Sequence, residues 1–276
     1  MFGSAIIVFR ETLEAALLIG IIAAATRGLS GRNLWLAVGI GVGLAGALVV
    51  AGLTERIAEL AEGSGQELFN AAILGIAVFM LGWHNIWMAS HGREMASQAK
   101  VVGNEVRAGQ REMSALAILI ALAVLREGSE TALFLYGLAA SDGGGRLPLL
   151  SGGLLGLAGG IGMGWVIYSG LARIPIGQFF AVTSGLILLL AAGMAGQMAR
   201  FLVQGDIVRP LASPLWDSSS LLPMDSAMGN LLHLLAGYEA RPSGMQVLFY
   251  TLTFIVILLG MRWSRTPAPT QTPQAI

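Results

Sequence analysis

Two stretches of the sequence, FRETLEAAL at residues 9–17 and LREGSETAL at residues 125–133, share the frame R-E-x-x-E. Each frame lies inside a long apolar segment, and Arg10 and Arg126 are 116 residues apart. A charged side chain at the centre of a membrane helix costs about 2.5–3.5 kcal/mol on insertion scales, so such residues face the inside of a helix bundle. The two frames therefore predict a bundle in which their charged side chains meet.

The rest of the sequence has the composition of a membrane protein. Of its 276 residues, 55% are hydrophobic and only 12% are charged, and the mean hydropathy is +0.73; soluble domains carry about a quarter charged residues. This composition excludes a soluble enzyme and a disordered chain. The formal net charge of zero gives no attraction to nucleic acid. The absence of cysteine excludes disulfides, iron–sulfur clusters and thiolate metal sites.

Hydropathy predicts an all-α, polytopic membrane protein with seven transmembrane helices, because each apolar run can cross a hydrocarbon core of about 30 Å. The predicted spans are 4–27, 34–53, 68–90, 114–138, 147–171, 176–203 and 245–263. The organisation predicted from them is a first three-helix repeat (1–90), a cytoplasmic loop (91–113), a second three-helix repeat (114–203), an extracytoplasmic loop (204–244), a seventh transmembrane helix (245–263) and a disordered tail (264–276).

The spacing of the two frames predicts an inverted repeat. Shifting the second span by 116 residues gives 150–169, which falls on the fifth span, and shifting the third gives 184–206, which overlaps the sixth. Each repeat has three helices, an odd number, so the second repeat enters the membrane from the opposite side. Carriers built this way place their binding site near the bilayer midplane, between the repeats.

Glycine spacing indicates where helices pack closely. Two spans carry glycine at every fourth position, namely Gly39 and Gly43 in the second span and Gly152, Gly156, Gly160 and Gly164 in the fifth. Small residues at this spacing let two helix backbones approach each other within a membrane. We therefore expect both stripes to serve helix packing.

Positive residues set the expected orientation, because cytoplasmic loops are enriched in Lys and Arg. With the N-terminus outside, nine of the 16 Lys and Arg residues fall on the inner side and five on the outer side, and the other two are Arg10 and Arg126. We therefore expect a multi-pass protein with its N-terminus outside and its C-terminus inside.

The charged side chains of the two frames form a candidate metal site. Each frame presents two glutamates on one helix face, and an arginine four residues before the second glutamate, where a guanidinium can fork onto the carboxylate. The glutamates are Glu11, Glu14, Glu127 and Glu130, and the supporting arginines are Arg10 and Arg126. Together they carry a formal charge of −2, which suits hard cations such as Fe(III), Fe(II), Mn(II), Mg(II) and Ca(II). The alternative is two separate Arg–Glu ion pairs that only lock the helices together.

Three further residues are candidates for guiding an ion to or from this site. His84 and His91 lie on one face at the inner end of the third span and could bind a departing ion, since neutral imidazole is a metal ligand. Interfacial histidines near a helix end are the simpler interpretation. Asp217, in the last outer loop, could receive a cation at the outer surface, against the alternative of an ordinary turn residue.

With these motifs the sequence resembles the high-affinity iron permease family, which comprises the EfeU-type permeases of bacteria and their fungal counterparts. That family carries an R-E-G-L-E-type motif in its first and fourth spans, of seven, and the matching segments here are RETLE at 10–14 and REGSE at 126–130. The loop LWDSSSLLP at 215–223 and the segment 228–250 are also similar to the family. The middle of each motif departs from the pattern, because Thr12 replaces glycine and Ser129 replaces leucine.

The resemblance implies a permease, not an enzyme, that imports ferric or ferrous iron across the cytoplasmic (inner) membrane. Iron is then the transported substrate, and no permanently bound cofactor is expected. The resemblance also implies that any ferroxidase, peroxidase or periplasmic iron-binding protein is a separate partner, and that nucleic acid is not one. Two alternatives stay open: a carrier for another divalent metal such as lead or manganese, and an intramembrane di-iron oxidase. Such oxidases use Glu-x-x-His, which neither frame contains.

Overall fold

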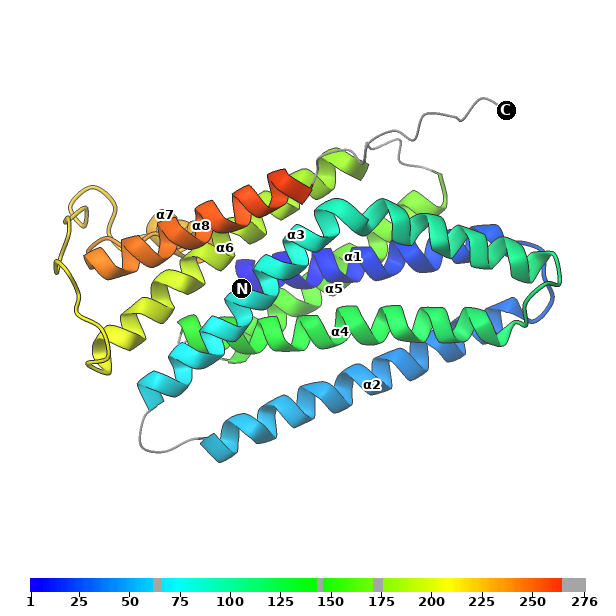
Figure 1. Cartoon of the computed structure of the whole chain (residues 1–276), viewed down its shortest axis with the longest axis horizontal. Coiled ribbons are helices and arrows are strands. Elements are labelled where there is room, and N and C mark those ends of the chain that lie inside the picture. The colour runs from blue at the N-terminus through cyan, green and yellow to red at the C-terminus, as the bar shows by residue number, and fades with distance from the viewer. Residues whose placement is uncertain (62–65, 143–145, 171–175, 265–276) are drawn as a thin grey trace, which may run out of the picture.

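Helices make up the fold wherever the structure describes the chain. The computed structural model describes residues 1–61, 66–142, 146–170 and 176–264, and in these ranges it contains eight α-helices and no strand. The helices are α1 (Phe2–Ala25), α2 (Arg32–Ala61), α3 (Gln66–Arg107), α4 (Ser114–Asp142), α5 (Arg146–Tyr168), α6 (Ile176–Gln204), α7 (Ala227–Ala236) and α8 (Gly244–Ser264). Seven of them are long, and α7 is a ten-residue helix within the connection between α6 and α8 (Figure 1).

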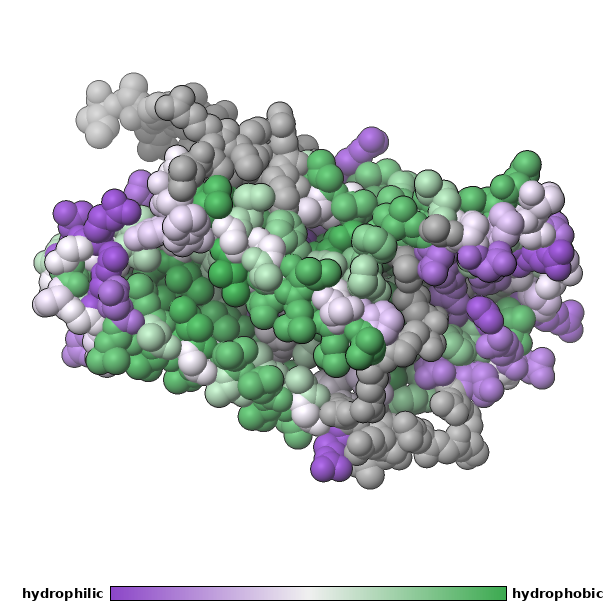
Figure 2. Space-filling model, turned by 180° about the vertical axis from the view of Figure 1, so that it is seen from behind, coloured by the Kyte–Doolittle hydropathy of each residue, from purple (hydrophilic) through white to green (hydrophobic). Residues whose placement is uncertain are grey.

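Five helices, α2, α3, α5, α6 and α8, are long and apolar enough to cross a membrane. The other two long helices, α1 and α4, have 24 and 29 residues, so at 1.5 Å per residue they also match a core of about 30 Å. They differ from the five because each carries the three charged residues of an R-E-x-x-E frame. Figure 2 shows hydrophilic side chains gathered at the two ends of the molecule and a hydrophobic surface between them. The chain is therefore a helical membrane protein.

Each predicted span overlaps one of the seven long helices, but two helices continue beyond the predicted ends. Helix α2 reaches Ala61, and α3 reaches Arg107, so residues 91–107 are helical and only 108–113 connect α3 to α4. The prediction of a loop over 91–107 was wrong because polarity was equated with a loop, whereas the Ala, Gln, Lys and Glu residues in this segment are good helix formers. Of the predicted tail, Ser264 belongs to α8, and 265–276 lie outside the described residues.

Two pairs of helices approach each other closely along glycine faces. Helix α5 packs against α1, and α2 packs against α4. A Cβ atom on Gly43 would lie 2.7 Å from the carbonyl oxygen of Ala121, and a Cβ atom on Gly160 would lie 2.9 Å from the carbonyl oxygen of Phe9. Because such distances are too short for a carbon atom, these positions require glycine, as the spacing predicted.

Helices α1, α3 and α4 surround the middle of the bundle. Helices α1 and α4 contact each other and run in opposite directions, and α3 contacts both of them as well as α6 and α8 (Figure 1). Buried apolar side chains beside this point include Ile7, Leu81, Phe134 and Ile187, from α1, α3, α4 and α6. This packing holds the two R-E-x-x-E frames against each other.

The connection between α6 and α8 folds back on itself at one end of the bundle. The backbone N–H of Ser218 donates to the Ala240 carbonyl oxygen at 2.9 Å, and that of Leu215 donates to the Pro242 carbonyl oxygen at 2.7 Å. Ser226 caps the N-terminus of α7, because its side-chain oxygen accepts a hydrogen bond from the N–H of Gly229 at 3.0 Å. Residues 205–243 are therefore held by backbone hydrogen bonds and a helix cap.

Candidate metal site

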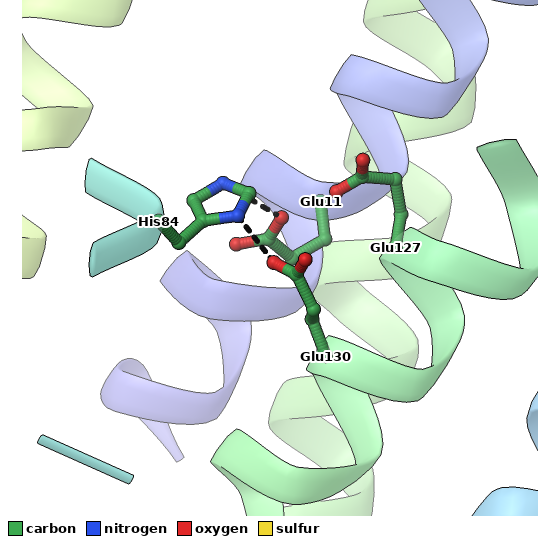
Figure 3. Close-up of side chains that lie close together, drawn as sticks. All are labelled: Glu11, His84, Glu127 and Glu130. Carbon is green, nitrogen blue, oxygen red and sulfur yellow. Dashed lines mark ion pairs between the residues drawn. The ribbon is translucent and has the colours of Figure 1, made fainter. Parts of the chain in front are cut away.

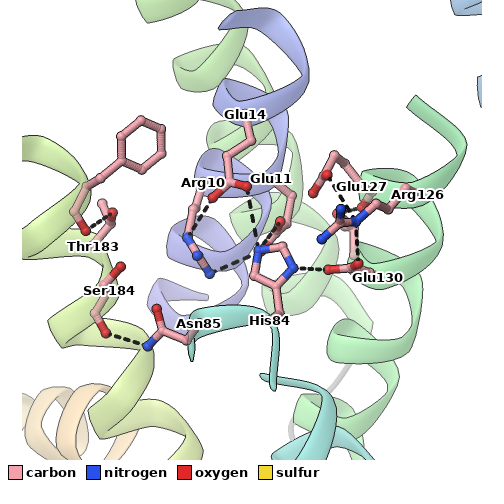
Figure 4. Close-up of polar contacts among 12 residues, drawn as sticks. Arg10, Glu11, Glu14, His84, Asn85, Arg126, Glu127, Glu130, Thr183 and Ser184 are labelled. Carbon is pink, nitrogen blue, oxygen red and sulfur yellow. Dashed lines mark hydrogen bonds and ion pairs between the residues drawn. The ribbon is translucent and has the colours of Figure 1, made fainter. Parts of the chain in front are cut away.

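The two R-E-x-x-E frames hold their second glutamate in the same way. In α1, Arg10 Nε lies 3.0 Å from Glu14 Oε1, and in α4, Arg126 Nε lies 3.0 Å from Glu130 Oε1 (Figure 4). Both pairs are four residues apart and therefore share a helix face. Each arginine thus braces the second glutamate of its own frame, as the spacing predicts.

The first glutamates of the two frames face each other between α1 and α4. Figure 3 shows Glu11 and Glu127 entering the cluster from the two helices, with the Glu11 carboxylate turned toward the His84 ring. Each lies 3.6 Å from the nearest arginine nitrogen of its own frame, which is further than the second glutamates lie. Glu11 is 1% exposed and Glu127 is 5% exposed. Both carboxylates are therefore buried and only loosely paired.

His84 of α3 lies among these carboxylates. One potential ligand atom from each of Glu11, His84, Glu127 and Glu130 lies within 4.8 Å of the others. The ring Nδ1 contacts Glu130 Oε2, and Nε2 lies 3.6 Å from Glu11 Oε2 and 3.6 Å from Glu14 Oε2. The structure thus brings three of the four candidate glutamates, Glu11, Glu127 and Glu130, together with His84 (Figure 3). The fourth, Glu14, is not part of this group but lies beside the same ring (Figure 4).

The position of His84 differs from the one its sequence context indicated. The sequence made His84 a candidate for the inner end of the path, but its side chain is buried inside the cluster. Asn85, the next residue, donates from Nδ2 to the Ser184 carbonyl oxygen of α6 at 3.0 Å, which fixes this turn of α3. The polar pair His84–Asn85 within an apolar span could have shown that this turn faces protein, although not which residues it meets.

His91 does not join the cluster. Its ring stacks on Trp87 with the ring centroids 5.0 Å apart, and its Nδ1 lies 2.7 Å from Ser90 Oγ. The Arg126 guanidinium lies over the same Trp87 ring, 4.3 Å from its centroid. The structure therefore separates His91 from the carboxylates by a tryptophan and an arginine.

Asp217 lies in the connection between α6 and α8, away from the cluster. Its Oδ1 accepts hydrogen bonds from the backbone N–H of Ser219 at 3.0 Å and from the Ser219 hydroxyl at 2.6 Å, and its Oδ2 lies 2.9 Å from Arg241 Nη2. The Ser219 hydroxyl and the Arg241 guanidinium lower the pKa of Asp217 to about 2. Its negative charge is thus matched locally by Arg241.

The cluster contains buried oxygen atoms that lack a hydrogen-bond donor among the described residues. Both carboxylate oxygens of Glu11 and the Oε2 atom of Glu127 are buried without a hydrogen bond. An uncompensated buried charge costs on the order of several kcal/mol. A cation among these groups would supply the missing partner, and a set of carboxylate oxygens with one imidazole nitrogen suits iron or manganese.

Comparison with known proteins identifies the family. The sequence profile of the iron permease FTR1 family matches residues 1–267. The ferrous iron permease EfeU of Escherichia coli O6:H1 is 34% identical over 266 residues, which cover 94% of this chain and 95% of that protein. The ferrous iron permease EfeU of Yersinia pestis is 31% identical over 268 residues, which cover 94% and 92%. No solved structure matches the chain. The chain therefore belongs to the iron permease FTR1 family, and it is a membrane permease rather than an enzyme.

Proposed function

We propose that this protein imports iron across the cytoplasmic membrane through the cluster of glutamates at the centre of the bundle. Its residues are Glu11, Glu14, Glu127 and Glu130, with Arg10 and Arg126 as supports. The observation that carries this proposal is the meeting of two R-E-x-x-E frames, one from α1 and one from α4, around one buried point. The relatives in Escherichia coli and Yersinia pestis are named ferrous iron permeases, which supports iron as the transported ion.

The two glutamates of each frame take different roles in this mechanism. Glu11 and Glu127, which are buried and loosely paired, replace water around the arriving ion. Glu14 and Glu130 are held ionised and oriented by the arginine four residues earlier. A guanidinium has no lone pair to offer a metal, so the arginines act only on the carboxylates.

Transport uses an inverted repeat of α1–α3 and α4–α6, with α8 as the seventh span. In such a repeat, α1 corresponds to α4 and α2 corresponds to α5. The packing of α5 on α1 should therefore have a counterpart in the packing of α2 on α4, and both contacts occur. Helices α1 and α4 run in opposite directions (Figure 1), as two repeats that enter the membrane from opposite sides would. Rocking of one repeat against the other then exposes the site alternately to the two sides.

The outer surface in this proposal is the end that carries α7 and residues 205–243. The turn from α1 to α2 and the connection from α3 to α4 lie at the opposite end (Figure 1). They contain Arg27 and Arg111, and the adjoining helix ends carry Arg32 and Arg107. Positive residues favour the cytoplasmic side, which supports an orientation with the N-terminus outside. A separate ferroxidase, peroxidase or iron-binding protein would deliver iron at the end formed by residues 205–243.

Fe(II) is the oxidation state that the charge of the cluster favours. Four carboxylates and two guanidiniums give a formal charge of −2 with His84 neutral. A divalent ion brings this to zero, whereas Fe(III) leaves a positive charge in a buried site, which is unfavourable. Among divalent ions, manganese and lead are the competitors against which iron must be compared.

Uptake into proteoliposomes tests the proposal. The purified full chain would be reconstituted and assayed with radioactive Fe(II) under ascorbate, and in parallel with Fe(III), Mn(II) and Pb(II). We expect Fe(II) uptake to exceed that of the other ions, and Glu11→Gln and Glu127→Gln each to lower it by at least about tenfold, the scale at which metal-site changes act. Each change keeps the shape of the side chain and removes one negative charge.

Glu94→Gln is the matched control, because Glu94 is on α3 but exposed, away from the cluster. Its uptake should equal that of the wild type. Uptake by folded Glu11→Gln and Glu127→Gln proteins within twofold of the wild type would exclude the site. Oxidation of Fe(II) by the protein without uptake would instead identify an intramembrane oxidase.

A further inference from the structure

The glutamate cluster contains one imidazole ring, whose nitrogen atoms are potential metal ligands. His84 is 3% exposed, and its ring lies where side chains from α1 and α4 converge (Figure 3). The carboxylates of Glu11, Glu127 and Glu130 each place an oxygen within 4.8 Å of a ring nitrogen and of one another. Ligands of one ion, each about 2.1 Å from it, lie at most about 4.2 Å apart, so the ring and the carboxylates near it lie close to the spacing that one ion requires.

The ring is oriented as a metal-binding histidine is. Its Nδ1 contacts Glu130 Oε2, and the other oxygen of Glu130 lies 3.0 Å from Arg126 Nε. Phe134 packs edge-on against the ring, with the centroids 6.4 Å apart. Metal-bound histidines usually direct their second nitrogen to a carboxylate in this way, which fixes the ring. Nδ1 is thus in contact with a carboxylate that Arg126 holds in place.

The second nitrogen has carboxylates near it but no hydrogen bond. Nε2 lies 3.6 Å from one oxygen of Glu11 and from one of Glu14, which is beyond the 2.7–3.2 Å range of an N–H···O hydrogen bond. Both ring nitrogens are buried without a hydrogen bond among the described residues, but Nδ1 is in direct contact with a carboxylate oxygen, whereas Nε2 is not. An unpaired nitrogen that points between two carboxylates has the arrangement expected of a ligand atom.

We propose that His84 binds the transported ion through Nε2 and gives the site its preference for Fe(II) over Mg(II) and Ca(II). This inference rests on the proposed function of the glutamate cluster and names a ligand and a substrate class for it. Carboxylates alone suit Mg(II) and Ca(II), whereas imidazole favours iron and the later transition metals. One nitrogen among the oxygens therefore selects a divalent transition metal over the abundant alkaline-earth ions.

Electron paramagnetic resonance tests the ligand directly, with one equivalent of Cu(II) as the spin probe on the untagged full chain in detergent. The chain has three histidines, His84, His91 and His233, so the double variant His91→Gln/His233→Gln keeps only His84. We expect its electron-spin-echo signal to show the modulation from the remote nitrogen of a bound imidazole. A signal without this modulation would overturn the proposal, and this result does not depend on the folding of a His84 variant.

Uptake tests the selectivity. For His84→Gln we expect the ratio of Fe(II) to Mg(II) uptake in proteoliposomes to fall by at least about tenfold, with Mg(II) uptake kept. His233→Gln is the control, because His233 lies on α7 with its Nδ1 on the Tyr238 carbonyl oxygen, and its ratio should match the wild type. An unchanged ratio in His84→Gln would overturn the proposal.

The glutamate variants separate this inference from the proposed function. If Glu11→Gln and Glu127→Gln abolish Fe(II) uptake while His84→Gln keeps the wild-type ratio, the glutamate site stands and the role of His84 is wrong. If the glutamate variants transport Fe(II) normally, the proposed function itself fails, whatever His84→Gln does.

Discussion

Arg10 and Arg126 occupy the same place in the two R-E-x-x-E frames, yet Arg10 is shut away from solvent and Arg126 is not. The side chain of Arg10 is 1% exposed and that of Arg126 is 32% exposed, although each places its Nε 3.0 Å from the second glutamate of its frame. Arg126 extends over the ring of Trp87, 4.3 Å from the centroid. The two arginines thus make the same contact with their glutamates but differ in their exposure to solvent.

The opposite directions of α1 and α4 relate this difference in exposure to the two sides of the cluster. Because α1 and α4 run in opposite directions (Figure 1), the arginine that precedes the glutamates in each frame lies on opposite sides of the cluster. In the proposed orientation Arg10 lies toward the outside and Arg126 toward the inside. In the proposed mechanism, a site that is closed at Arg10 and accessible at Arg126 would correspond to one of the two end states of a rocking carrier.

The first prediction concerns the stability of these two positions. Arg10→Met should lower the free energy of unfolding by about 3–5 kcal/mol, because it leaves the buried carboxylates of Glu11 and Glu14 without a counter-charge. Arg126→Met should cost about 1 kcal/mol, because a partly exposed ion pair is screened by solvent. Thermal unfolding of both variants in the same detergent measures the difference.

The double variant Arg10→Met/Glu14→Gln is the control for this prediction. It removes a charge of each sign, and it should recover part of the stability lost in Arg10→Met. An equal loss in Arg10→Met and Arg126→Met would mean that the two sides of the cluster are equally accessible, against the asymmetry described above.

The second prediction compares two glycines on one turn of α2. A Cβ atom on Gly43 would lie 2.7 Å from the Ala121 carbonyl oxygen and 2.7 Å from Val124 Cβ, whereas a Cβ on Gly41 meets nothing within 4 Å. Gly43→Ala should destabilise the protein by about 1–3 kcal/mol, because it forces α2 away from α4. Gly41→Ala should be neutral or slightly stabilising, by up to about 1 kcal/mol. Equal unfolding temperatures of the two variants would contradict the close packing of α2 on α4.

Local patterns in the sequence were sufficient to place the seven long helices, but not α7, which lies within the predicted loop 204–244. Apolar runs located seven long helices, and glycine at every fourth position marked the packed faces of α2 and α5. The same reasoning failed at 91–107, where α3 continues to Arg107. Hydropathy reports where a chain leaves the lipid, and it does not report where its helix ends, because helix propensity continues past the apolar core.

The candidate site could be predicted only where its signal was local. The spacing in each frame predicts the contacts of Arg10 with Glu14 and of Arg126 with Glu130, since residues four apart share a helix face. The place of His84 depends on how α3 packs against both α1 and α4. That packing is a contact between segments far apart in the chain, which no spacing within α3 could reveal.

The third prediction tests the orientation with single cysteines, which the sequence makes straightforward because the chain has none. Ser220, in the connection between α6 and α8, and Ser30, in the turn between α1 and α2, are both exposed. A membrane-impermeant maleimide should label Ser220→Cys in right-side-out vesicles and label Ser30→Cys only after permeabilisation. Labelling of Ser30→Cys in intact vesicles, with Ser220→Cys protected, would reverse the proposed orientation.

The fourth prediction concerns the charge of Asp217, in the connection between α6 and α8. Its pKa of about 2 lies below the ordinary value of 3.8, so the ionised form is favoured by folding. The stability that this carboxylate contributes is present above about pH 4 and is lost as the pH falls through 2. Ser219→Ala should raise the pKa toward 3.8 by more than Arg241→Gln does, because the 2.6 Å bond from the Ser219 hydroxyl is the largest cause of the shift. A pH titration of the Asp217 carboxyl carbon by NMR measures this pKa in the wild type and in the two variants.

A wild-type midpoint near 3.8 would show that the Ser219 and Arg241 contacts do not persist in the membrane protein. With the midpoint near 2, Asp217 stays charged between pH 5 and pH 8, and any change of iron uptake in that range must arise from other groups.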